Sequence, residues 1–268
     1  MIQVSPDRTR SSAGFDVTVI VAVKNGVDTL EACLVSILSQ EDLRVGVIVV
    51  DGCSTDGTLE IVELYRPHLL AILSDAGRGV FSAWNEALKL AHSPWIAFLG
   101  SDDRYSDKRA LAKMVSAAQK SDSPPVFVYS QISQRDAHDR ELRVLGQPWH
   151  VAKAQFSYRM SVCHCGALHA RELFDEGGFD TSFQIVGDYE FLYRKRDRLR
   201  VVFVNEPLVW ARTGGLSTRF DLAIAQKLEL KRVFKIHRAG IGVSLCWYVG
   251  MSLTLASVAI ARIRALIR

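Results

Sequence analysis

The chain has 268 residues, about half of them hydrophobic, and a formal net charge of +4 at pH 7. This length suits one large α/β domain with or without a small appendage, and the hydrophobic content excludes a largely disordered chain. The mildly basic charge fits an anionic substrate or an anionic membrane surface. It is too small to indicate a partner nucleic acid, and the sequence has neither an aromatic–basic RNP pattern nor C2H2 spacing.

Cysteine usage and the N-terminal residues bear on the compartment. The five cysteines are scattered, and none of them forms a Cys-x-x-Cys pair. Such an odd, scattered set favours a reducing, cytoplasmic environment. Residues 1–14 are polar and lack the apolar run of a secretion signal, which favours the same compartment.

In the first 120 residues, β-rich apolar runs alternate with amphipathic patterns of helical period. Asp28 and Glu31 have the spacing of a capping box, so we expect the first helix to begin there. The repeated strand–helix units predict a mostly parallel, doubly wound sheet. The predicted strands of this part are Phe15–Val23, Val45–Val50, Leu69–Leu73 and Trp95–Leu99.

After Pro124 and Pro125 the pattern changes. A helix is predicted over Asp188–Arg196, and the spacing of apolar residues no longer follows regular strand–helix units. The predicted strands of this second part are Val126–Ile132, Leu142–Leu145 and Val201–Val204.

Carboxylates follow three of the first four predicted strands: Asp51, Asp75, and the pair Asp102 and Asp103. A single aspartate after a strand usually forms a turn or caps a helix. Ligands of open α/β sheets, however, bind beyond the carboxyl ends of the strands, where these acids would meet. Carboxylates alone would repel a phosphate, whereas a divalent cation held by them would bind its oxygens.

Two common phosphate-binding motifs are absent from the sequence. It contains no GxxxxGK[ST] loop, and Lys24-Asn25-Gly26 stands after the first strand in place of GxGxxG. A P-loop nucleotidase and a dinucleotide-dependent oxidoreductase are therefore disfavoured.

Four segments together resemble family 2 glycosyltransferases of the GT-A fold. They are residues 17–25, 49–58 (VVDGCSTDGT), 74–85 and 98–103 (FLGSDD). The resemblance implies an α/β fold with a Rossmann-like, mostly parallel sheet flanked by helices, over residues 15–217. Residues 15–120 would form its nucleotide-sugar-binding half and residues 121–217 its acceptor half.

The resemblance also implies roles for individual residues on the donor side. Asp51 would hydrogen-bond the nucleotide base, and Asp103 would hold Mg²⁺ or Mn²⁺ against the diphosphate. This agrees with the chemistry of the reaction, because a fixed cation stabilises the charge that develops on the leaving diphosphate. The other donor-binding residues implied are Ala22, Val23, Lys24, Asn25, Asp75, Arg78, Gly79, Asn85 and Asp102.

On the acceptor side, Asp188 of the stretch Gly187-Asp188-Tyr189-Glu190-Phe191 stands where the family places its catalytic base. A carboxylate there would take the proton of the attacking hydroxyl and invert the anomeric centre. The alternative is that Asp188 only caps its helix. His164 would lie near the acceptor, and a zinc site of Cys163, His164, Cys165 and His169 is a weaker alternative. Residues 212–217 would form a mobile loop near the diphosphate.

The C-terminal residues 218–268 have a separate character. Residues 239–261 contain no charged side chain, and basic residues flank them on both sides. A C-terminal hydrophobic helix is therefore expected, which would span a membrane, lie on its surface or pack on the protein. The first two alternatives place the chain at the cytoplasmic face of the plasma membrane, where a lipid-linked or saccharide acceptor would be met.

Two rival functions stay open. A sugar-phosphate nucleotidyltransferase would share the fold but would need a glycine-rich, basic loop after the first strand, which residues 24–26 do not supply. A catalytically silent, membrane-bound nucleotide-sugar-binding protein would not need Asp103 and Asp188. The QxxRW signature of processive synthases is absent, which favours the addition of one sugar per encounter.

Overall fold

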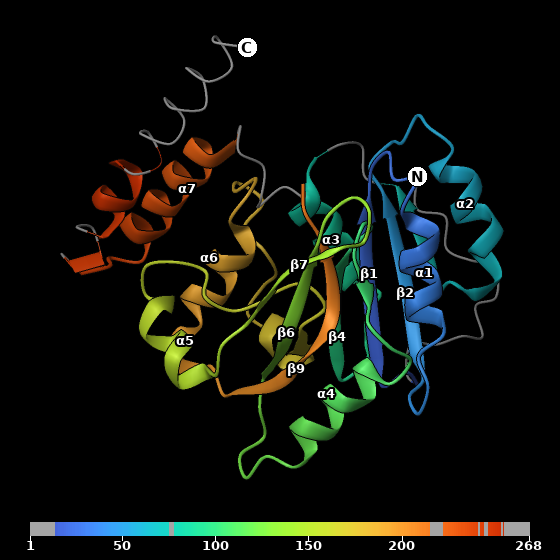
Figure 1. Ribbon diagram of the computed structural model, residues 1–268, viewed down its shortest axis with the longest axis horizontal. Helices are drawn as coiled ribbons and strands as arrows, with labels where there is room; N and C mark the ends of the chain where they lie inside the picture. The colour runs from blue at the N-terminus through green and yellow to red at the C-terminus, as the bar shows by residue number, and fades with distance from the viewer. Residues whose placement is uncertain are drawn as a thin grey trace.

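The computed structural model describes residues 14–74, 78–214, 222–240, 242–243, 246–252 and 254. These residues form a mixed nine-stranded sheet with the order β3-β2-β1-β4-β8-β6-β9-β5, and β7 pairs with β6 (Figure 1). The strands are β1 Val17–Val23, β2 Val45–Asp51, β3 Ala71–Ser74, β4 Trp95–Gly100, β5 Arg104–Tyr105, β6 Phe127–Arg135, β7 Glu141–Leu145, β8 Leu168–Ala170 and β9 Val201–Arg212.

Helices flank this sheet (Figure 1). The α-helices are α1 Leu30–Leu38, α2 Thr58–Tyr65, α3 Val80–Leu88, α4 Ala110–Gln119, α5 Trp149–Phe156, α6 Gly187–Arg194 and α7 Ala223–Ile236. Short 3-10 helices lie at Arg66–His68, Arg171–Phe174 and Arg196–Arg198.

The four predicted strands of the first half are confirmed, and β1, β2, β3 and β4 run parallel to one another. Their side chains alternate between two apolar clusters, so Ile20 joins the cluster that includes α3 whereas Val19 and Val21 join the cluster that includes α1 and α4. A strand buried on both faces has no polar side, which is why these runs are almost continuously apolar.

The second half adds strands that the sequence pattern did not indicate. β8 lies between β4 and β6 and is antiparallel to both. β5 pairs with the end of β9. These strands have three and two residues, too few to show a period. β9 is longer than the predicted run Val201–Val204, because it continues past Pro207 to Arg212 through a shift in its register with β6.

The predicted capping box at the first helix is wrong. Helix α1 begins at Leu30, its N-cap residue is Thr29, and no side chain caps it. The turn is closed by the backbone instead, because the Gly26 carbonyl accepts hydrogen bonds from the N–H groups of Thr29 and Leu30. Asp28 is thereby left to line a cavity that is described below.

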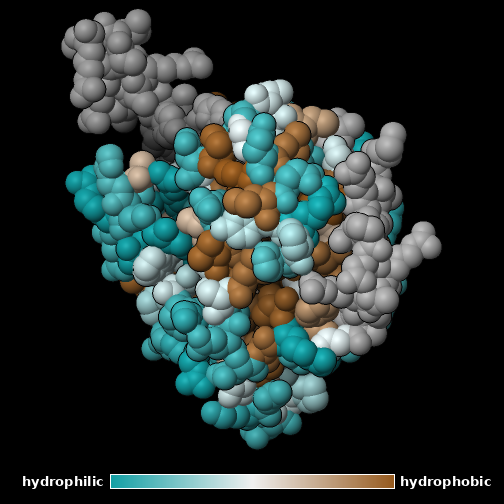
Figure 2. All heavy atoms as spheres, turned by 90° about the vertical axis from the view of Figure 1, so that its right-hand side faces the viewer, coloured by the Kyte–Doolittle hydropathy of each residue, from teal (hydrophilic) through white to brown (hydrophobic). Residues whose placement is uncertain are grey.

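Two surfaces outside the sheet differ in character. On the face of α1 and α2, hydrophobic atoms form a band between polar ones (Figure 2), and Val35, Leu59 and Leu64 are exposed there. At the other end, α7 is amphipathic and basic, with Leu230, Val233 and Phe234 buried, and residues 246–252 form further helical turns after it. Within the described part of the chain, no helix is long and apolar enough to cross a membrane. Much of the expected hydrophobic helix lies outside the described residues.

Candidate active site

The carboxyl ends of β1, β2 and β4 bring the predicted donor residues to one edge of the sheet. Val23 is in register with Asp51, and Ala22 with Gly100, two residues before Asp102. Asp51 is almost fully buried, and its carboxylate accepts a hydrogen bond from the backbone N–H of Ser54 at 3.1 Å. The expected convergence of acids is thus present for Asp51, Asp102 and Asp103, whereas Asp75 lies outside the described residues.

The loop after β1 is fastened to the loop after β2. Asn25, which has a φ of 53°, accepts a hydrogen bond from the Thr55 N–H at 2.8 Å and donates its own N–H to Ser54 Oγ at 2.9 Å. The Gly26 N–H donates to Thr58 Oγ1 at 2.8 Å. The polar side chains of residues 54–58 therefore hold the backbone of the predicted base pocket in one shape.

Asp102 and Asp103 fold back over Gly100. A Cβ atom at residue 100 would lie 2.7 Å from Asp103 Oδ2 and 2.9 Å from Asp102 Oδ1, so only glycine leaves room for both carboxylates. Each side chain keeps some accessible surface but sits deep among protein atoms. Burial raises the pKa of both carboxyls, and the neighbouring charge of Asp102 raises the pKa of Asp103 further.

Both oxygens of Asp103 have partners from distant parts of the chain. Oδ2 lies 2.7 Å from the thiol of Cys165, which precedes β8, and Oδ1 accepts the backbone N–H of Arg212 at 2.9 Å. Arg212 ends β9, so the first residue of the predicted loop 212–217 does lie against the acidic pair. Residues 215–217 lie outside the described chain.

The acidic pair fits a divalent cation. Two adjacent, half-buried carboxylates place negative charge close together where water screens it poorly, and a hard cation would balance that charge. In the described segments, no three His, Cys, Asp or Glu side chains gather into a metal site. Asp103, with Asp102 beside it, is the residue that would hold such a cation.

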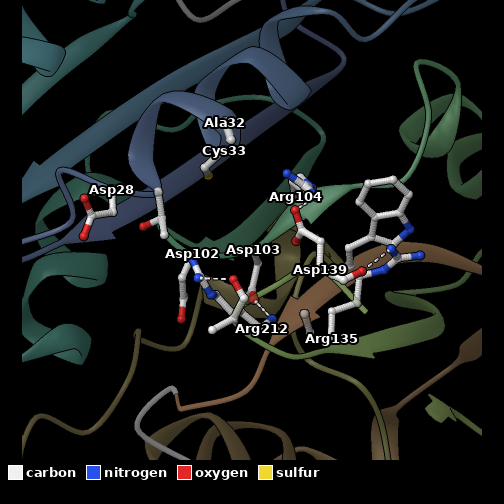
Figure 3. A pocket seen from close by; sticks show the side chains of 13 residues that line it. Asp28, Ala32, Cys33, Asp102, Asp103, Arg104, Arg135, Asp139 and Arg212 are labelled. Carbon is white, nitrogen blue, oxygen red and sulfur yellow. Dashed lines mark hydrogen bonds and ion pairs between the residues drawn. The ribbon is translucent and has the colours of Figure 1, made fainter. Parts of the chain in front are cut away.

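A cavity of about 260 Å³ opens beside the acidic pair (Figure 3). The indole ring of Trp210 lies between two guanidinium groups on its wall, with Arg135 at 4.0 Å and Arg104 at 4.7 Å from the ring centroid. The β6–β7 turn closes one side, because Asp139 pairs with Arg104 at 2.8 Å and Arg212 donates to the Ala137 carbonyl. The lining residues are Asp28, Thr29, Ala32, Cys33, Asp102, Asp103, Arg104, Arg135, Ala137, Asp139, Trp210, Ala211 and Arg212.

Three other predicted donor residues lie at the start of α3 or within it. Arg78 is exposed, and Gly79 is the N-cap of α3 with a φ of 100°. Asn85 faces the opposite half, where its amide donates to the Phe179 carbonyl and accepts the Phe179 N–H, both at 2.8 Å. These two hydrogen bonds hold Phe179 against α3. A contact of Asn85 with the donor stays a prediction.

Asp188 stands in the first turn of α6. Its Oδ1 accepts the N–H of Tyr189 at 2.8 Å, and burial raises its pKa to about 6. The carboxylate of Glu229 on α7 contributes to this rise and itself accepts the backbone N–H groups of Gln184, Ile185 and Val186. An aspartate with such a pKa is ionised at neutral pH and close to the range that suits a general base.

His164 is buried within an aromatic cluster. Its ring lies 4.8 Å from that of His169 and 5.6 Å from that of Trp84, and burial lowers its pKa to about 3. The His164 side chain does not line the cavity beside Asp103. Its contact with an acceptor stays a prediction, and the weaker zinc alternative gains no ligand set from the described residues.

The fold is that of GT-A glycosyltransferases. Among solved structures, the mannosyltransferase PcManGT of Pyrobaculum calidifontis, in complex with GDP-Man and Mn²⁺, is similar with a TM-score of 0.65. The two chains are 21% identical, and the similarity covers 98% of this chain and 78% of that one. The predicted fold class is thereby confirmed.

Sequence comparisons give the family. The model described as Glycosyl transferase family 2 matches residues 18–176, so the chain belongs to this family and is a glycosyltransferase. It is 30% identical over 231 residues to the PGL/p-HBAD biosynthesis glycosyltransferase of Mycobacterium bovis, covering 84% of this chain and 86% of the relative. It is also 38% identical over 88 residues to UDP-Glc:alpha-D-GlcNAc-diphosphoundecaprenol beta-1,3-glucosyltransferase WfaP of Escherichia coli, covering 32% and 35% of the two chains.

Several contacts around the acidic pair and around Asp188 were not predicted from the sequence. Cys165 reaches Asp103 across 62 positions, and Trp210 meets Arg104 and Arg135 only because β5, β6 and β9 are neighbours. Glu229 lies beyond the motifs of the family. Contacts between residues so far apart in the sequence depend on the order of strands in the sheet, which a local sequence pattern does not predict.

Proposed function

We propose that the chain is a metal-dependent, inverting glycosyltransferase that moves a sugar from a nucleotide diphosphate donor to an acceptor hydroxyl. The observation that carries this is the half-buried pair Asp102–Asp103 at the carboxyl end of β4, folded over Gly100 beside the loops that follow β1 and β2. The mannosyltransferase of similar fold holds GDP-Man and Mn²⁺, which supports a nucleotide sugar and a divalent cation here.

In this proposal each residue has a distinct task. Asp51 and the backbone of residues 22–25 hold the base, while Asp102 contacts the ribose. Asp103 would hold Mg²⁺ or Mn²⁺, which neutralises charge on the departing diphosphate when it is bound. Asp188 takes the proton of the acceptor hydroxyl as that oxygen attacks the anomeric carbon from the side opposite the diphosphate, and the configuration inverts.

The acceptor is proposed to be lipid-linked or a saccharide, in the synthesis of a cell-surface polysaccharide or glycolipid. The names of the two relatives support this, since one acts on a diphosphoundecaprenol-linked sugar and the other in PGL/p-HBAD biosynthesis. We further propose that residues 218–268 hold the chain at the cytoplasmic face of the membrane, where such an acceptor is anchored.

A panel of labelled nucleotide sugars, offered with Mg²⁺, Mn²⁺ or EDTA, tests the reaction. Metal-dependent release of a nucleoside diphosphate is expected for one donor. Release of pyrophosphate would instead identify a nucleotidyltransferase, and donor binding without turnover, with lipid-linked and saccharide acceptors present, would identify a silent binding protein.

A further inference from the structure

A second cavity, of about 610 Å³, lies between α7 and the helical turns at 246–252, on the other side of the molecule from the loops that follow β1 and β2. Four of its nine lining residues are cations and none is acidic. Its walls also carry the aromatic side chains of Trp247 and Tyr248. The lining residues are Leu228, Lys231, Arg232, Phe234, Lys235, Arg238, Ala239, Trp247 and Tyr248.

Most cations of this groove form no ion pair with a carboxylate of the described residues. Arg232 donates to Ser182 and lies over the ring of Phe183. Lys231 lies 4.6 Å from the ring centroid of Trp247 and 5.3 Å from that of Tyr248. Among the described residues, no carboxylate pairs with Lys231, Lys235 or Arg238. The groove is therefore left with positive charge that an external anion would balance.

Apolar side chains stand exposed on the same elements. Trp247 is anchored, because its indole N–H donates to the Lys227 carbonyl at 2.6 Å. Cations beside exposed aromatic and aliphatic groups are typical of surfaces that bind the interface between water and the hydrocarbon core of a membrane. The exposed fractions are 55% for Leu228, 49% for Ile236, 56% for Tyr248 and 59% for Val249.

We propose that this groove docks the headgroup layer of an anionic phospholipid membrane. Lys231, Lys235 and Arg238 would face the lipid phosphates, while Tyr248, Val249 and Leu228 would enter the boundary between headgroups and acyl chains. The charge of the groove selects an anionic surface, and its apolar rim distinguishes that surface from a free phosphate ion.

Glu229 and Arg232 connect α7 to the loop before α6. Glu229 accepts three consecutive backbone N–H groups, at residues 184–186, directly before the helix that carries Asp188. Arg232 holds Ser182 of the same loop. A membrane held by α7 would thus lie next to the loop that presents the proposed base. The inference rests on the membrane association proposed above and assigns it to particular residues.

Cosedimentation with vesicles tests the proposal on the full chain. Vesicles of phosphatidylcholine alone are compared with vesicles that also contain phosphatidylglycerol, at low and high salt. The chain is expected to bind only the anionic vesicles and to be partly released by salt, because exposed charges are screened. The double variant Lys231→Glu/Lys235→Glu should bind them at least about tenfold more weakly.

Lys120→Glu/Lys153→Glu is the matched control, since it reverses two exposed lysines at the end of α4 and on α5, and it should bind like the parent. Tyr248→Ala should lose the binding that survives high salt. Thermal unfolding and nucleoside diphosphate release with a water-soluble acceptor should be unchanged in all three variants.

Unchanged vesicle binding by Lys231→Glu/Lys235→Glu would overturn the proposal, as would equal weakening in the control pair. Complete competition by inorganic phosphate would also overturn it and indicate a simple anion site. If the parent chain binds no vesicle at all, both the groove and the membrane association fail, while turnover of the donor still tests glycosyl transfer separately.

Discussion

The thiol of Cys165 lies 2.7 Å from Oδ2 of Asp103, so a residue 62 positions further along the chain touches the carboxylate proposed to hold the metal. The Arg212 N–H fixes the other oxygen. Groups that contact a metal ligand in this way set its orientation, and their loss usually lowers metal affinity.

Replacing Cys165 by alanine is therefore expected to weaken Mn²⁺ binding about tenfold, as measured by the electron paramagnetic resonance of free Mn²⁺. Cys165→Ser keeps a donor hydrogen and should retain most of the affinity. Cys163→Ala removes a thiol two residues away and serves as the control. Equal affinities for the alanine and serine variants of residue 165 would show that the thiol does not orient Asp103.

Asp103→Ala is expected to lower metal-dependent transfer by roughly 100-fold or more, the scale of losing one electrostatic stabiliser of the transition state. The initial rate of nucleoside diphosphate release at saturating Mn²⁺ measures this. Asp139→Asn is the comparison, because Asp139 lines the same cavity but pairs with Arg104. A variant of Asp103 that keeps near-normal, EDTA-sensitive activity would move the metal elsewhere.

Asp188→Asn should keep donor binding and lose transfer by roughly 100- to 10,000-fold, since the amide cannot accept the proton. In the parent chain, log(kcat/KM) should fall by about one for each pH unit below about 6, where Asp188 becomes protonated. Titration calorimetry with the donor and pH–rate profiles separate the two effects. A parallel loss of donor affinity would assign Asp188 to the donor site.

The same raised pKa predicts a change in stability. Asp188 binds its proton more tightly in the folded chain, with a pKa of about 6 against an ordinary value of 3.8. Below pH 3.8 the carboxyl is protonated in both the folded and the unfolded chain, so it lowers the free energy of unfolding no more than a neutral side chain would. As the pH rises through 6 the folded chain must hold an ionised Asp188, and the free energy of unfolding falls. Asp188→Asn should therefore raise the free energy of unfolding at pH 7.5 by up to about 3 kcal/mol, because one pKa unit is about 1.4 kcal/mol.

Urea unfolding of the Asp188→Asn variant and its parent at pH 7.5 and near pH 4 tests the stability change. The gain should shrink towards the lower pH, where both states of the parent chain become protonated. A gain of the same size at both values would indicate that the substitution acts through packing.

Glu229→Gln should loosen the entry to α6, because an amide oxygen replaces a carboxylate that receives three backbone N–H groups. Hydrogen bonds to a charged acceptor stabilise more than those to a neutral one, so we expect the free energy of opening this loop to fall by about 1–3 kcal/mol. Hydrogen exchange of residues 184–186 measures it. Unchanged protection there would mean that Glu229 does not hold the loop.

The sequence predicted the parallel half of the sheet because fully buried strands leave continuous apolar runs, as in Val45–Val50. It also predicted that Asp51, Asp102 and Asp103 would share one edge, because parallel strands bring their carboxyl ends together. It did not predict β5 or β8, which are too short for a period, or the contacts of Asp103 with Cys165 and Arg212, which depend on strand order. The roles assigned to single residues still await the variants described above.

The paired hydrogen bonds between Asn85 and Phe179 join α3 to the loop before α6 across 94 positions. These two segments cannot separate without breaking both bonds at once. Opening for product release is therefore expected at the β6–β7 turn, where the pair Arg104–Asp139 and a hydrogen bond from Arg212 are among the restraints. In this enzyme, opening of the β6–β7 turn, and not movement of whole domains, would then set the rate of product release.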